Sequence, residues 1–236
     1  CPIFFQRGRC MVLIRRGFLI AAAFTAAAIV LLSLCLSSVA AGLSSPAIFT
    51  VVLDAGHGGV DPGVLGVQTK VKESDLNLMI VRELQEDFEN AGFAVVLTRT
   101  DEGGLYGLPT EGFKKRDMQK RKEIIESAAP RLMISVHQNN FVSDRSRRGG
   151  QVFYNGESEE GKALADSIQS RLNALGGCAY SALKGDYYML NCTQYTSVIV
   201  ECGFLSNAED EKLLTSKSYR EQLAYEIFTG TLAFLG

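Results

Sequence analysis

From residue 48 onward, short apolar runs alternate with segments in which apolar residues recur every three or four positions. Such runs, rich in β-branched residues, are typical of buried strands, and the three-to-four spacing is typical of amphipathic helices. We expect strands at 48–53, 93–98, 132–136, 151–154 and 198–200. We expect helices at 74–91, 114–128, 158–176 and 219–234. This alternation predicts an α/β fold: a single domain with a mostly parallel, twisted sheet and helices on both faces.

The first 42 residues follow a different pattern, a basic start and then a long apolar run. Arg15 and Arg16 precede an apolar stretch at 17–36, which at about 1.5 Å per residue is long enough for a bilayer core of about 30 Å. Small residues of the kind found before a signal-peptidase site follow at 38–41. We therefore expect residues 1–42 to be a signal peptide or a membrane anchor of an exported protein, with Met11 as a candidate start of translation.

Composition and charge exclude several classes of protein. The apolar share of 47% is enough for one sizeable core in the remaining residues, 43–236. The formal charge is −2, and four arginines lie before residue 17, so the rest of the chain is mildly acidic and we expect no nucleic-acid partner. The six cysteines include no C-x-x-C pair, which argues against a zinc ribbon and a disulfide scaffold.

Polar residues follow three of the predicted strands at the points where they end. His57 follows the first strand in a glycine-rich loop, His137 follows the third, and Glu201 follows the last. Glu73 immediately precedes the first predicted helix. Because sites in open α/β sheets form outside the carboxyl ends of the strands, we expect these side chains to lie at one site.

The two histidines and Glu73 are candidate ligands of a metal ion. Two neutral imidazoles and one carboxylate suit Zn²⁺ and leave a fourth position for water or substrate. His57, Glu73 and His137 would then hold one zinc ion per chain. The alternative for each histidine is a hydrogen-bonded structural residue at the end of a strand.

Glu201 follows three apolar β-branched residues and should therefore be buried. An ionised carboxylate in such a place is costly, so its pKa should be raised unless a cation lies close. Beside a metal ion, Glu201 could accept a proton from water and pass it to a leaving amine. The alternative, which the residues fit equally well, is a buried salt bridge to Arg99 or Arg121.

Six short sequence motifs follow one another along the chain. They are Val52–Gly59, Asp61–Gly63, Glu73 with Asn77–Leu78, Leu97–Arg99, Ile134–Asn139 and Val200–Asn207. In this order they resemble the zinc-dependent N-acetylmuramoyl-L-alanine amidases, and the resemblance extends from about residue 50 to the C-terminus. It implies that residues 43–236 are a catalytic amidase domain with a zinc site at the carboxyl ends of the strands.

The resemblance also implies a substrate and residue roles. His57, Glu73 and His137 match the family's zinc ligands, and Glu201 matches its catalytic glutamate. The family cleaves the amide bond between N-acetylmuramic acid and L-alanine of the stem peptide, with zinc activating water and the glutamate carrying the proton. The implied substrate is a peptidoglycan glycan strand with its stem peptide, met outside the cytoplasm in the cell wall or at the membrane.

Further strings, at 137–140, 150–154 and 186–190, resemble the sporulation-type branch of this family. That branch removes stem peptides from spore-cortex glycan before muramic-δ-lactam forms. The resemblance implies action at the forespore cortex, with the N-terminal membrane segment or an activating or targeting protein partner bringing the enzyme to the wall. Two alternatives are a housekeeping autolysin of cell separation with the same chemistry, and a catalytically silent wall-binding or regulatory module.

Overall fold

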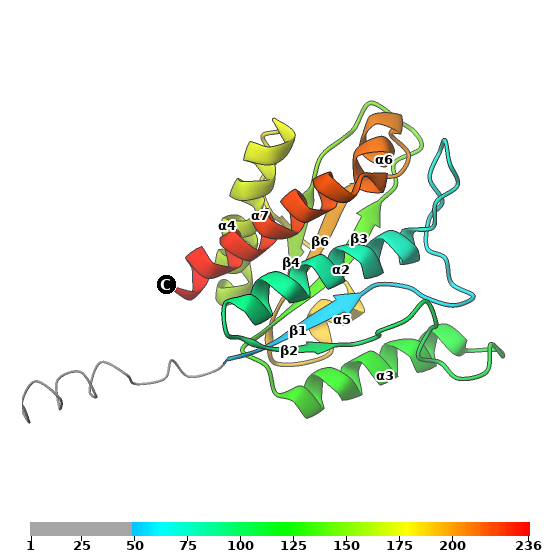
Figure 1. Cartoon of the computed structure of the whole chain (residues 1–236). Coiled ribbons are helices and arrows are strands. Elements are labelled where there is room, and N and C mark those ends of the chain that lie inside the picture. The colour runs from blue at the N-terminus through cyan, green and yellow to red at the C-terminus, as the bar shows by residue number, and fades with distance from the viewer. Residues whose placement is uncertain (1–48) are drawn as a thin grey trace, which may run out of the picture. The chain divides into compact units, whose positions relative to one another are not determined.

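The sheet lies at the centre of the fold because its middle strands are apolar on both faces. In the computed structural model, which describes residues 49–236, six strands pair in the order β2-β1-β3-β6-β4-β5 (Figure 1). They are β1 (Thr50–Ala55), β2 (Ala94–Leu97), β3 (Leu132–Asn139), β4 (Gln151–Tyr154), β5 (Leu183–Lys184) and β6 (Thr196–Phe204). All neighbouring strands are parallel except β4 and β6. The expected mostly parallel sheet is therefore confirmed.

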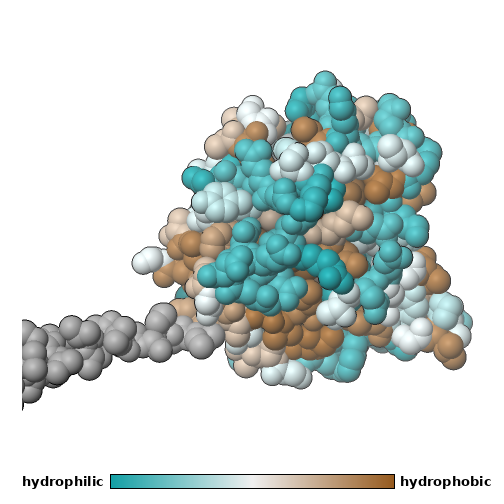
Figure 2. Space-filling model, in the orientation of Figure 1, coloured by the Kyte–Doolittle hydropathy of each residue, from teal (hydrophilic) through white to brown (hydrophobic). Residues whose placement is uncertain are grey.

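Helices cover both faces of this sheet, as predicted. The helices are α2 (Glu73–Asn90), α3 (Phe113–Ala128), α4 (Glu159–Gly176), α5 (Tyr188–Asn191), α6 (Ala208–Thr215) and α7 (Lys217–Leu235). On one face α2 and α4 pack against the sheet, and α7 packs against both of them; α3 and α5 lie on the other face. Successive residues of β1 therefore point into two different hydrophobic cores, one on each face of the sheet. Val51 and Leu53 belong to the first core, and Val52 belongs to the second. Polar residues cover much of the outer surface of α2 and α7, with apolar residues between them (Figure 2).

The described residues, 49–236, form one compact unit. The expected signal peptide or membrane anchor, residues 1–42, lies outside the described residues. Within residues 49–236, no helix combines the length and the apolar character that a membrane crossing requires.

The structure differs from the expected elements at the ends of β3 and β6. Both strands continue past their apolar runs, so His137 and Glu201 lie within the strands and are register partners across the β3–β6 pair. The apolar pattern is interrupted because His137 and Glu201 face the site, although Cys202 of β6 again belongs to a core. The pattern also does not predict β5, α5 or α6, which are too short for a clear periodicity.

A buried ion pair joins α3 to the end of β1. The guanidinium of Arg121, which is fully buried, lies 2.6 Å from Oδ1 of Asp54 and 2.7 Å from Oδ2 of Asp117. Asp54 also accepts hydrogen bonds from the hydroxyl groups of Thr98 and Ser135. Burial alone would raise the pKa of Asp54, but Arg121 and the two hydroxyl groups outweigh it and hold this pKa at about 2. The pair is therefore charged and fully hydrogen-bonded inside the fold.

Replacement of Arg121 by methionine should destabilise the protein strongly, because Asp54 would stay buried without its cation. We expect the free energy of unfolding, measured by urea denaturation, to fall by about 3–5 kcal/mol. Lys162→Met removes an exposed pair with Asp166 and is the matched control, with an expected cost below about 1 kcal/mol. Equal losses in the two variants would show that the buried pair contributes no more than a surface pair.

Candidate metal centre

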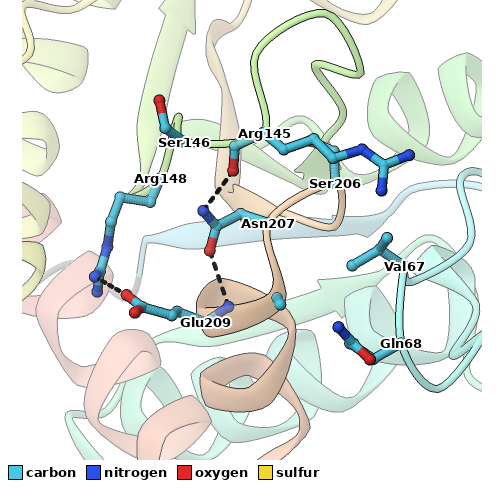
Figure 3. A pocket seen from close by; sticks show the side chains of 9 residues that line it. Val67, Gln68, Arg145, Ser146, Arg148, Ser206, Asn207 and Glu209 are labelled. Atoms are coloured by element: carbon cyan, nitrogen blue, oxygen red, sulfur yellow. Dashed lines mark hydrogen bonds and ion pairs between the residues drawn. The ribbon is translucent and has the colours of Figure 1, made fainter.

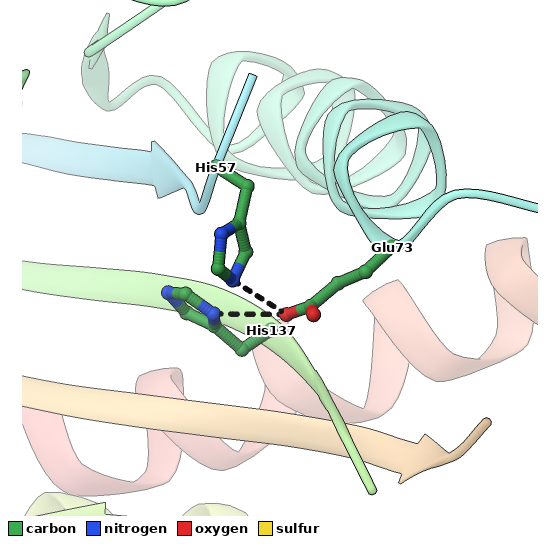
Figure 4. A group of neighbouring side chains, drawn as sticks. All are labelled: His57, Glu73 and His137. Carbon is green, nitrogen blue, oxygen red and sulfur yellow. Dashed lines mark hydrogen bonds and ion pairs between the residues drawn. The ribbon is translucent and has the colours of Figure 1, made fainter. Parts of the chain in front are cut away.

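His57, Glu73 and His137 come together at the carboxyl ends of the strands (Figure 4). His57 follows β1, Glu73 is the first residue of α2, and His137 lies near the end of β3. Nε2 of His57 lies 3.2 Å from Oε1 of Glu73, and Nδ1 of His137 lies 3.0 Å from the same oxygen. One ligand atom of each residue lies within 4.8 Å of the other two. Segments far apart in the sequence thus form one group of side chains that could bind a metal ion.

The geometry of this group fits a zinc ion. With Zn–N and Zn–O distances near 2.0–2.1 Å, tetrahedral ligand atoms lie about 3.3 Å apart, close to the two separations observed here. In the described part of the chain the group has three members, so a tetrahedral ion would keep one position open. His57 has a further carboxylate partner of the kind that orients metal ligands, since its Nδ1 lies 3.1 Å from Oδ2 of Asp61.

Two buried arginines hold the backbone that carries His57. Arg121 donates hydrogen bonds to the carbonyl oxygens of Ala55 and His57, at 2.8 and 2.6 Å. Arg99 donates to the carbonyl oxygens of Ala55 and Gly56, at 2.9 and 3.1 Å. His57 itself has a φ of 62°, a left-handed conformation that non-glycine residues rarely adopt. The arginines therefore stabilise the turn from which the His57 side chain projects.

Glycine is required where the backbone approaches two of the ligands. A Cβ atom on Gly56 would lie 2.2 Å from the ring of His137. A Cβ atom on Gly63, whose φ is 66°, would lie 2.4 Å from Oε2 of Glu73. Any side chain at Gly56 or Gly63 would displace a member of the group, which explains why glycine stands at these two positions.

The three side chains are electrostatically coupled. Burial alone would raise the pKa of Glu73, but hydrogen bonds and charge interactions with His137 and His57 hold it well below its usual value. Burial alone would lower the pKa of His57, but Glu73 and Asp61 outweigh this effect and raise it. Glu73 is thus an ionised carboxylate in an enclosed site, which is the form that binds a cation.

Glu201 lies beside this group on β6, next to His137 in the strand register. Burial raises the pKa of Glu201 to about 7, while the neighbouring His137 lowers it, Glu73 raises it and His57 lowers it. Its Oε2 atom is buried and has no hydrogen-bond partner among residues 49–236. A buried carboxylate oxygen without a partner is unusual in a folded protein and points to a group that interacts only when a ligand is bound.

The alternative interpretation of Glu201, a salt bridge with Arg99 or Arg121, is wrong for the described structure. Arg121 pairs with Asp54 and Asp117, and Arg99 binds backbone carbonyl groups. The sequence pattern did not identify this arginine network. The only local signal was the four-residue spacing of Asp117 and Arg121 on one helix, which usually indicates an exposed pair.

The described part of the chain is similar to known proteins over most of its length. The family model Amidase_3, described as N-acetylmuramoyl-L-alanine amidase, matches residues 51–233. The germination-specific N-acetylmuramoyl-L-alanine amidase of Bacillus subtilis (strain 168) is 32% identical over 190 residues, which cover 78% of each chain. The amidase LytC of the same organism is 29% identical over 188 residues, which cover 78% of this chain and 35% of LytC.

A solved structure is similar in fold and sequence. The CwlD amidase from Clostridioides difficile, determined in complex with the GerS lipoprotein, superimposes with a TM-score of 0.75 and 36% sequence identity. The superposition covers 79% of this chain and 98% of the CwlD chain. The similarity therefore extends over nearly the whole of a CwlD-sized catalytic domain.

Proposed function

The chain belongs to the N-acetylmuramoyl-L-alanine amidase family, and we propose that it uses one zinc ion, held by His57, Glu73 and His137, to cleave peptidoglycan. The scissile bond is the amide between N-acetylmuramic acid and L-alanine of the stem peptide. The observation that carries the proposal is the convergence of the three side chains, with one nitrogen of each histidine 3.0–3.2 Å from Oε1 of Glu73 and the three ligand atoms within 4.8 Å of one another. Intact ligands together with Glu201 argue against a silent wall-binding or regulatory module.

Glu201 is the proposed general base and general acid. When bound, zinc supplies a Lewis acid that polarises the amide carbonyl and acidifies water. As a buried carboxylate beside His137, Glu201 can accept a proton from the attacking water and donate it to the leaving amine of L-alanine. Its buried Oε2, which has no partner among residues 49–236, is free to make these transfers. Asp61 fixes the ring orientation of His57 through Nδ1.

We further propose that the enzyme acts in spore-cortex maturation, in the step that precedes muramic-δ-lactam formation. Support comes from two relatives, one named a germination-specific amidase and the other the CwlD amidase, whose chain the similarity covers almost completely. The similarity to the amidase LytC, whose name carries no reference to germination, covers only 35% of that protein. Expression confined to sporulation would favour the proposed role, and expression during vegetative growth the housekeeping alternative.

The proposed catalytic domain is residues 43–236, exported to the outside of the cytoplasm by residues 1–42. That segment would also anchor the protein in the membrane if it is not cleaved. A protein partner that activates or targets the enzyme is proposed as well, since the similar CwlD structure contains the GerS lipoprotein. No nucleic-acid partner is proposed, because the chain carries a small net negative charge.

A digest of purified peptidoglycan tests the proposed activity. The zinc-loaded protein should release stem peptides that begin with L-alanine and leave glycan without peptides, both identified by mass spectrometry. A chelator should abolish the release and added zinc should restore it, because the three ligands have no catalytic use without the ion. No release by the zinc-loaded protein, either alone or together with its activating partner, would contradict the proposal and favour the silent module.

Replacement of Glu201 by glutamine should separate catalysis from metal binding. We expect kcat to fall by about 10²- to 10⁴-fold, the usual contribution of proton transfer, with zinc content still near one ion per chain. His137→Ala should instead lose zinc and activity together. Glu159→Gln changes an exposed glutamate at the start of α4 and should leave both quantities unchanged. Full activity of the Glu201 variant would remove this residue from the mechanism.

A further inference from the structure

A pocket lies at the carboxyl end of the sheet, between three loops (Figure 3). Its walls are the loop before α2, the loop between β3 and β4, and the turn from β6 into α6. The residues that line it include Val67, Gln68, Arg145, Ser146, Ser206 and Glu209. The cavity volume of about 480 Å³ is within the range of small-molecule sites, roughly 300–1,000 Å³.

The pocket is within reach of the candidate metal centre. The N–H group of Val64 donates a hydrogen bond of 2.9 Å to Oε2 of Glu73, and Val67 of the pocket wall follows three residues later. Three residues of extended chain span at most about 11 Å. On the strand side, the N–H group of Leu205 binds the carbonyl oxygen of Asn139 at the end of β3. A peptide of two or three residues that starts at the metal centre can therefore reach the pocket.

Arg145 provides an uncompensated positive charge in the pocket. Its backbone is fixed, because the side-chain amide of Asn207 donates a hydrogen bond of 2.7 Å to the Arg145 carbonyl oxygen. Its side chain extends past Ser206 toward Val67, and the guanidinium is exposed and makes no ion pair or hydrogen bond with residues 49–236 (Figure 3). The neighbouring Arg147 differs, since its guanidinium lies 4.7 Å from the centre of the Phe141 ring.

The acidic residues at the start of α6 have other partners. Glu209 pairs with Arg148, which also lines the pocket. Asp210 accepts hydrogen bonds from two backbone N–H groups. Glu211 accepts three hydrogen bonds from the loop before α2. Arg145 is therefore left with its charge available to a ligand.

We propose that this pocket binds a carboxylate carried by the second or third residue of the stem peptide, with Arg145 as its partner. The inference rests on the proposed function, because the stem peptide extends from the scissile amide. Extended chain places the second and third residues about 4 and 7 Å from the first, which is within the upper limit of about 11 Å between the candidate metal centre and Val67. A guanidinium matches a carboxylate with two parallel hydrogen bonds, and the side-chain amide of Gln68 adds a neutral donor to the wall.

Two matched substrates test this proposal by kinetics. One is a soluble muramoyl tripeptide with free carboxylates, and the other is the same compound with every carboxylate converted to a carboxamide. The wild-type protein should prefer the acidic compound by about tenfold in kcat/KM, mainly through KM, the usual effect of one exposed charge-assisted hydrogen bond. Arg145→Gln should lose this preference while cleaving the carboxamide compound at the wild-type rate, and Arg145→Lys should keep part of it.

The control is Arg147→Gln, which removes a neighbouring charge outside the pocket and should keep the full preference. Equal cleavage of both compounds by the wild-type protein would overturn the proposal. An equal loss in the Arg147 variant would also overturn it, because the effect would then come from the general charge of the loop.

Binding of the free acidic tripeptide, measured by calorimetry, separates this inference from the proposed function. If the protein cleaves muramoyl peptides but the tripeptide binds equally to the wild type and Arg145→Gln, the pocket assignment is wrong and the amidase activity stands. If Arg145→Gln binds the tripeptide about tenfold more weakly but the wild type cleaves nothing, the pocket assignment stands and the proposed activity fails.

Discussion

The buried ion pair between Arg121 and Asp54 supports the turn on which the metal centre depends. Through the same guanidinium, Arg121 binds the carbonyl oxygens of Ala55 and His57 and so connects α3 to the backbone after β1. A left-handed conformation at a non-glycine residue costs on the order of 1–3 kcal/mol and persists only where its surroundings enforce it. The ion pair, with Arg99 beside it, provides that enforcement and aims the His57 imidazole at Glu73.

The rest of the site follows from the regular elements around this turn. The register of β3 and β6 places His137 beside Glu201, and the start of α2 brings Glu73 between the histidines. Ligands on strands and on a helix end are held more rigidly than ligands on loops would be. The loops outside them form the pocket around Arg145, where variation can change the accepted peptide without disturbing the metal centre. The proposed catalytic residues thus lie at the ends of the strands and the start of α2, and the proposed peptide-binding residues lie on the surrounding loops.

Much of the fold could be predicted from the sequence, because long elements have a clear period. The strands and helices before and after the glycine-rich loop were correctly located, and the structure brings together the His57, Glu73 and His137 side chains that the strand ends indicated. The arginine network could not be predicted, since Arg121 and Asp54 are far apart in the sequence and no local pattern joins them. The pocket could not be predicted from the sequence either, because its three walls meet only through tertiary contacts. Short elements such as α6 depend on caps and packing more than on periodicity.

Anomalous X-ray scattering at the zinc edge, from crystals of the zinc-loaded protein, shows directly whether His57, Glu73 and His137 bind a zinc ion. We predict one zinc ion per chain, bonded at about 2.0–2.1 Å to His57, Glu73 and His137, with the Glu201 carboxylate outside bonding distance. Zinc at another position, or bonded to Glu201 in place of one of these ligands, would contradict the account of the site.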